Sequence, residues 1–215
     1  MRFSVASLAK LVKSSHNSFF LFFITCLAIL VLANFGPAEQ SLGTHIHIIY
    51  LHGAWVWASM GAFLFSAIFG ALGLLTRKSS HHAWSKAFGR TGLFFWITYL
   101  PLSLWAMQAN WNGLFLLEPR WRLALIFAIT GSLLQIGLTL ANQPNLTSAS
   151  NLGYFILLVF AILQTENIMH PVSPILKSDS IHIQGFFLGL VLLISFAAWQ
   201  IARWWYRLEP HHAQR

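Results

Sequence analysis

The stretch His45–Ser59, HIHIIYLHGAWVWAS, brings three histidines to the start of an apolar run that is rich in aromatic and small residues. His45 and His47 precede the run, whereas His52 lies about one helical turn inside its apolar boundary. An ionisable residue within an apolar span predicts a functional role, such as ligation of a metal. A structural histidine satisfied by hydrogen bonds is the alternative interpretation. Five small residues follow that would let a helix or ligand approach closely: Gly53, Ala54, Ala58, Gly61 and Ala62.

A second stretch with chemical potential is NWNGLFLLEPRWR, Asn110 to Arg122. It is amphipathic and too short to span a bilayer, so we expect it to lie in the membrane interface. Its charged cluster consists of Glu118, Arg120 and Arg122. Guanidinium groups bind carboxylates in bidentate fashion, so the two arginines predict a bound anion.

The third stretch is TENIMHPVSPILKSDSIHIQG, which contains His170 and His182. Either histidine could lie opposite His52 in a helix bundle. Two imidazoles, apolar walls and arginines match heme, which takes axial histidines and cationic partners for its propionates. Zinc is the alternative, because it wants three or four ligands, which His45, His47, His52 and His170 could supply.

The elements that must position these residues are membrane helices. The chain has 215 residues, of which 57% are hydrophobic and only 8% are charged; soluble domains carry about 25% charged residues. Run length and the absence of short alternating segments favour helices over a barrel. We therefore expect an all-α protein, a single polytopic membrane domain over residues 1–215. Its six transmembrane helices are expected at about 18–35, 48–75, 89–107, 122–141, 152–164 and 183–204.

The basic residues predict the orientation. Ten Lys and Arg fall on one side of the expected spans and three on the other, so the first side, with both termini, is expected to be cytoplasmic. The formal charge of +8 is then explained by topology, and nucleic-acid binding is not expected. Cys26 is the one cysteine and no C-x-x-C-H motif is present, which excludes covalent c-type heme attachment to this chain. The first run is longer than a signal-peptide core, and we expect it to be retained.

These motifs resemble the heme-handling proteins of cytochrome c maturation, the C component of that system. The family pattern I-I-Y-L-H, followed by small residues and a Trp, falls on HIIYLHGAWVWASMGA. The family's motif W-G-x-W-W-x-W-D-A-R aligns without gaps with WNGLFLLEPR, so that Trp111, Glu118 and Arg120 match. Its inner tryptophans are replaced by Leu114, Phe115 and Leu117. The family's N-x-L-H stretch before the last span resembles ENIMHP.

The resemblance implies the following expectations. His52 and His170 are the axial ligands of a non-covalent heme b, Arg120 and Arg122 pair with its propionates, Trp111 and Phe115 line its face, and Glu118 belongs to the same site. The chain would hold heme at the periplasmic face of a bacterial-type inner membrane and deliver it for cytochrome c maturation. Its implied partners are an ABC-type transporter, small membrane subunits and a periplasmic heme chaperone. This work is binding and transfer rather than catalysis.

Two alternatives remain open. The altered tryptophan motif also fits a non-catalytic scaffold subunit of a larger membrane complex, in which the apolar segment contacts protein or lipid. A b-type electron-transfer subunit is the other alternative. It would usually need histidines within the membrane near both faces, whereas the inner-face histidines of this chain fall in expected loops and tails.

Overall fold

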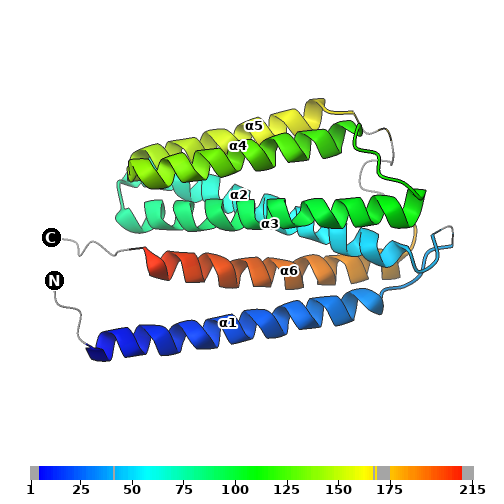
Figure 1. Ribbon diagram of the computed structural model, residues 1–215, viewed down its shortest axis with the longest axis horizontal. Helices are drawn as coiled ribbons and strands as arrows, with labels where there is room; N and C mark the ends of the chain where they lie inside the picture. Colours follow the sequence, from blue (N-terminus) through cyan, green and yellow to red (C-terminus); the bar gives the residue numbers. More distant parts are fainter. Residues whose placement is uncertain (1–4, 41, 167, 169–174, 210–215) are drawn as a thin grey trace.

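A computed structural model describes residues 5–40, 42–166, 168 and 175–209, and within 5–19 it describes the backbone alone. This part of the chain is all-helical, apart from an isolated bridge between Glu39 and Gly43 in the first loop. Its six helices run alternately up and down in one bundle (Figure 1). They are α1 (Val5–Asn34), α2 (Ile46–Thr76), α3 (Ser79–Trp111), α4 (Pro119–Ala141), α5 (Pro144–Gln164) and α6 (Ile181–Leu208).

Four of these helices, α2, α4, α5 and α6, are long and apolar enough to cross a membrane. The described apolar part of α1, Phe20–Asn34, is shorter than a full span. Helix α3 has 33 residues, but Trp, Tyr and Ser side chains and Pro101 interrupt its apolar half. The chain is therefore a helical protein of membrane-embedded type. That all six helices cross, with both termini on the cytoplasmic side, stays a prediction.

The predicted runs each fall on one helix. The fifth run, 152–164, is short, and the sequence left open an extension into NQPNLTSASN; α5 begins within that segment, at Pro144. Proline is favoured in the first helical turn because its missing N–H would be unpaired there anyway. The turn before it is tight, since Asn142 takes the left-handed conformation (φ 48°) and donates its N–H to the Leu138 carbonyl at 3.1 Å.

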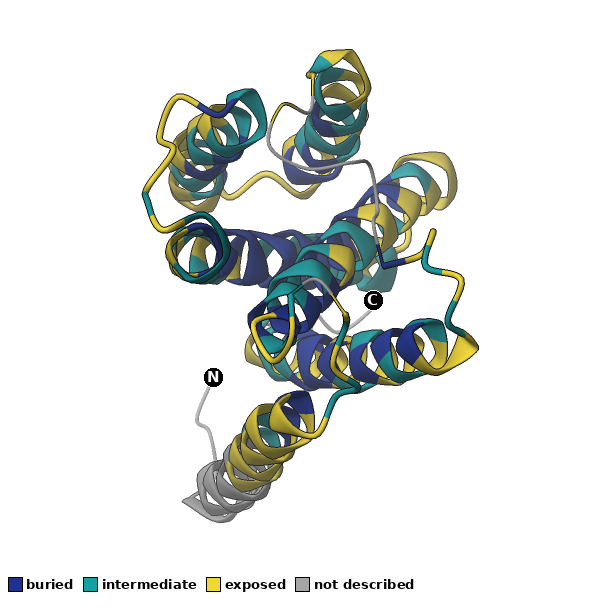
Figure 2. Cartoon of the chain, turned by 90° about the vertical axis from the view of Figure 1, so that its right-hand side faces the viewer, coloured by how far each residue is buried: buried dark blue, intermediate teal, exposed yellow. Residues whose placement is uncertain are grey.

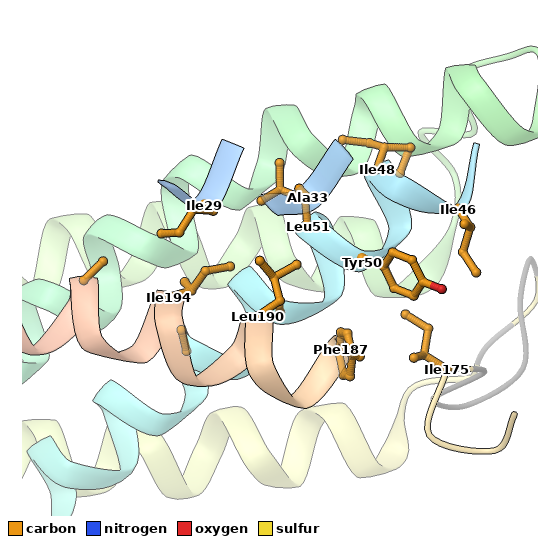
Figure 3. Close-up of a cluster of buried hydrophobic side chains, with 14 of the residues drawn as sticks. Ile29, Ala33, Ile46, Ile48, Tyr50, Leu51, Ile175, Phe187, Leu190 and Ile194 are labelled. Atoms are coloured by element: carbon orange, nitrogen blue, oxygen red, sulfur yellow. The ribbon is translucent and has the colours of Figure 1, made fainter. Parts of the chain in front are cut away.

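Helices α2 and α3 pack against each other most extensively and form the centre of the bundle. The pair α4 and α5 covers one side of this centre, and α6 followed by α1 covers the other (Figures 1 and 2). In its part with described side chains, helix α1 buries a narrow stripe, Thr25, Ile29 and Ala33, spaced four residues apart. Phe22 and Cys26 are half-buried there, and the remaining apolar side chains of that part are exposed. Tyr50, Phe187 and Leu190 belong to the buried cluster that joins α1, α2 and α6 (Figure 3).

Buried polar side chains join α5 to the central pair. Ser66 and Ser85 each donate their hydroxyl to the other's carbonyl, at 2.7 and 2.9 Å. Asn151 of α5 donates to the Ser85 carbonyl at 3.1 Å and accepts from Gln135 at 2.8 Å. Because each group is partnered, these bonds can hold helices together in an apolar medium at little desolvation cost.

Small residues of α2 face its neighbours as expected, with one exception. Ala54, Ala58 and Ala62 are buried. A Cβ added at Gly61 would meet no described atom within 4 Å, so the expectation of a close contact at Gly61 was wrong.

Candidate functional site

A cavity of about 270 Å³ lies at one end of the bundle. Its wall comes from the first turns of α2, α4 and α6 and the last turns of α3 and α5. Ile175 and Leu176, which precede α6, complete it. The volume is close to the lower end of the range of about 300–1,000 Å³ typical of ligand sites.

His52 lines this cavity from α2. Its ring is half-buried and lies against Tyr99 of α3, with 5.5 Å between the ring centroids and a tilt of 49°. Ile49, Val56 and His52 share one helical face because they are three and four residues apart. This α2 face therefore presents an imidazole within an otherwise apolar surface.

Helix α3 contributes residues that the sequence analysis missed. Five of these residues recur at three- and four-residue spacing and line the cavity together: Trp96, Tyr99, Ser103, Met107 and Asn110. Trp96 is buried and donates its indole N–H to the Ala124 carbonyl of α4 at 3.0 Å, which holds its ring in place. Their spacing was the available signal, but Phe and Leu residues on the other α3 faces hide it.

The polar wall of the cavity consists of Asn110, Glu118, Arg120 and Trp121. Glu118 is only 7% exposed, and in the described part of the chain neither of its carboxylate oxygens has a hydrogen-bond partner. The same holds for Asn110 Oδ1, Arg120 Nε and Trp121 Nε1. One terminal nitrogen of Arg120 donates to the Thr165 carbonyl at 3.4 Å. Buried polar atoms without partners are costly, so this wall suits a ligand that would pair with them.

The cavity brings together four of the residues that the sequence singled out: His52, Trp111, Glu118 and Arg120. Phe115 does not line it but contacts Trp111 edge to face, with 6.2 Å between ring centroids. Arg122 is exposed and lies outside the lining. His170, the other expected axial ligand, lies outside the described residues.

The charged groups of the cavity are not paired with one another. Within the described ranges, both ion pairs join Glu209 to Lys86 and Arg90, at 2.7 and 2.9 Å, at the opposite end of the bundle. Glu118 begins α4 as its N-cap without a side-chain capping bond. The positive end of the helix dipole favours a carboxylate there but supplies no hydrogen bond to it.

A zinc site is not assembled by the described residues, among which no group of three His, Cys, Asp or Glu could hold a metal ion. His47 donates Nε2–H to the Gly36 carbonyl at 2.9 Å, and His45 is exposed. The contact of His47 stabilises the first loop, and nothing in the described structure brings these two histidines to a shared metal.

Fold and cavity together define the class: an all-helical, membrane-type protein with a small, aromatic-walled cavity at one end of its bundle. Comparison of the chain with models of protein families, with curated proteins and with solved structures finds no match. The resemblance to the heme-handling proteins of cytochrome c maturation thus stays a prediction from the sequence motifs.

Proposed function

We propose that this protein binds heme in the cavity and delivers it at the outer membrane face for cytochrome c maturation. The observation that carries the proposal is that His52 and Arg120 line one cavity with aromatic walls. Heme binding asks for this combination of imidazole, cation and apolar surface. When bound, heme would supply the iron that His52 ligates. The chain itself would bind heme, orient it and release it.

The donor chemistry of the cavity fits heme. Arg120 has a buried Nε without a described partner, which suits a propionate, and Trp57, Trp96 and Trp111 offer aromatic surface. The volume of about 270 Å³ is small for a macrocycle. Heme would therefore extend past the exposed side of the lining, where Trp57 is 50% exposed.

The second axial ligand in this proposal is His170. Thr165 and Ile175 both line the cavity, and His170 is five residues from each along the chain. Five residues reach at most about 17 Å, so the chain length permits an approach to the cavity. Arg122 and Phe115, which are outside the lining, would contact the part of heme that extends from it.

The proposed location is a bacterial-type inner membrane, and the proposed partners are an ABC-type transporter, small membrane subunits and a periplasmic heme chaperone. They rest on the motif resemblance. The four apolar helices support a membrane location of unspecified type.

The test is a hemin titration of the purified full-length protein in detergent, followed by the Soret band. We expect a saturable Soret shift in the wild type. The affinity for hemin should fall at least about tenfold in His52→Ala, since an axial ligand is lost. His45→Ala is the matched control, because His45 is exposed and outside the lining, and it should bind as the wild type does. A wild-type protein that gives no shift would contradict the proposal.

A scaffold subunit is the second candidate, and one observation favours it. Between α3 and α4, Leu114, Leu116 and Leu117 are 54%, 47% and 81% exposed. Exposed leucines in a short segment suit a contact with another protein. Stable co-purification of a membrane partner without heme, lost in Leu117→Ser, would favour this candidate over heme delivery.

A further inference from the structure

Glu118 is the charged group of the cavity that has the fewest described hydrogen-bond partners. Its side chain is more than nine-tenths buried, it lines the cavity, and neither oxygen has a partner in the described part of the chain. A carboxyl group buried in this way needs a hydrogen-bond donor. Among the described residues no group supplies that donor, and an occupant of the cavity is one source of it.

The polar wall offers both acceptors and donors to an occupant. Glu118 and Asn110 present unpartnered acceptor oxygens, whereas Arg120 and Trp121 present unpartnered N–H donors. A fully ionised dicarboxylate supplies acceptors only. It would satisfy Arg120 and Trp121 but would bring a second negative charge against Glu118. Two neighbouring carboxylates in a buried site cannot both stay ionised and instead share one proton.

We propose that Glu118 makes ligand binding proton-linked, so that the cavity takes up a dicarboxylate ligand together with one proton. The proton is shared between the Glu118 carboxyl and one carboxylate of the ligand, while Arg120 pairs with the other. This inference rests on the proposed function, because heme carries two propionates. The proton comes from water when the ligand binds and returns to water on release, and no covalent bond in the ligand or protein changes.

The other titratable or charged groups of the lining are His52 on α2, Tyr99 on α3 and Arg120 on α4. The lining residues of α5, α6 and the segment before α6 are uncharged: Ile162, Thr165, Phe187, Ile175 and Leu176. Glu118→Gln leaves these groups unchanged, so its comparison with the wild type separates a proton shared by two carboxyl groups from the titration of the other groups.

The experiment measures hemin binding to the full-length protein at pH 7.5, 8.25 and 9. We expect the wild-type Kd to rise with pH, by up to about tenfold per pH unit, which is the limit for one proton taken up. In Glu118→Gln the amide supplies its own donor, so the Kd should change less than about twofold over the same range. Glu166→Gln is the matched control, since Glu166 is an exposed acid outside the lining, and it should keep the wild-type dependence.

Hemin dimethyl ester, which keeps the iron but has no free carboxylate, provides a second measurement that needs no variant. Its binding to the wild-type protein should not follow the hemin pH dependence. Equal pH dependence for hemin and its ester, or for wild type and a folded Glu118→Gln, overturns proton linkage while heme binding stands. If neither compound shifts the Soret band at any pH, heme binding itself is overturned, and this inference with it.

Discussion

His45, His47 and His52 are close in sequence but differ in surroundings. His45 is exposed before α2, and His47 donates a hydrogen bond to the Gly36 carbonyl and so ties the first loop to the helix start. His52 alone lines the cavity. His47 already holds a loop, and His45 and His47 both lie outside the lining, so the structure separates His52 from its neighbours by its position in the cavity wall.

His82, near the start of α3 and ahead of the expected span, leads to a prediction about pH. Its buried ring pairs with the Ser148 hydroxyl at 2.7 Å. Burial lowers the pKa of His82, and the nearby His81 lowers it further. The unfolded chain therefore binds a proton near pH 6.5 that the folded protein does not, so the stability contribution of this site is full above that pH and falls as the pH drops.

Thermal unfolding in detergent at pH 7.5 and 5.5 measures this effect. Wild type should lose stability at the lower pH, and His82→Gln should lose less. His45→Gln, which alters an exposed histidine, should lose as much as the wild type. An equal loss in His82→Gln and wild type would show that His82 has no part in the pH dependence.

One physical reason explains why the sequence did not reveal several residues of the cavity. Trp96, Tyr99 and Trp121 are aromatic residues in or beside apolar segments, where Trp and Tyr are common in any membrane protein. They line the cavity because of the way α3 packs against α4, and the local sequence pattern does not determine that packing. His52, Glu118 and Arg120 were identifiable because charge is rare in such segments.

Among the helices, the contact of α2 with α3 depends on Gly92. A Cβ placed there would lie 2.6 Å from the Phe63 ring. Gly92→Ala should therefore cost about 1–3 kcal/mol, because the buried ring cannot move freely. Gly137→Ala in α4 is the control, since no described atom lies within 4 Å of its added Cβ. It should be neutral or stabilising by up to about 1 kcal/mol.

Chemical or thermal unfolding in the same detergent compares the stability of Gly92→Ala and Gly137→Ala with that of the wild type. Equal stability of Gly92→Ala and Gly137→Ala would mean that α2 and α3 do not approach as closely as the structure shows.

The start of α5 shows why element boundaries were harder to predict than elements. The segment NLTSASN is polar but uncharged, so the sequence left open whether the fifth helix includes it. In the structure Thr147, Ser148 and Asn151 are buried against the rest of the bundle, where Ser148 pairs with His82 and Asn151 with Ser85. Polar residues inside a membrane-type bundle look like loop residues until their partners, distant in sequence, are known.

At the scale of the whole molecule, most of the Lys and Arg residues lie at the end of the bundle opposite the cavity. The α2–α3 turn and the end of α6 lie at one end of the bundle (Figure 1). Arg77 and Lys78 belong to that turn, and Glu209, which pairs with Lys86 and Arg90, follows α6. The cavity is lined from the opposite ends of the helices. An excess of Lys and Arg marks the cytoplasmic side of a membrane protein. The cavity is then expected at the outer face, which the proposed delivery of heme to a periplasmic partner would require.

Cysteine labelling tests both this sidedness and the number of spans. In a Cys26→Ser background, single cysteines replace Thr44, Ser79, Leu114 and Gln143, which are exposed and follow α1, α2, α3 and α4. A membrane-impermeant maleimide added to intact cells should label the Thr44 and Leu114 positions. It should reach the Ser79 and Gln143 positions only after the membrane is permeabilised.

The Leu114 position decides the case of α3, whose tryptophans, tyrosine and Pro101 make it less apolar than the other central helices. Those polar-tipped side chains face the cavity or neighbouring helices at Trp96, Tyr99 and Ser103 rather than lipid, so the bundle itself shelters them and α3 can still cross. Labelling at Leu114 only after permeabilisation would put that position on the same side as Ser79. In that case α3 would not cross, and the expected placement of the cavity at the outer face would be lost with it.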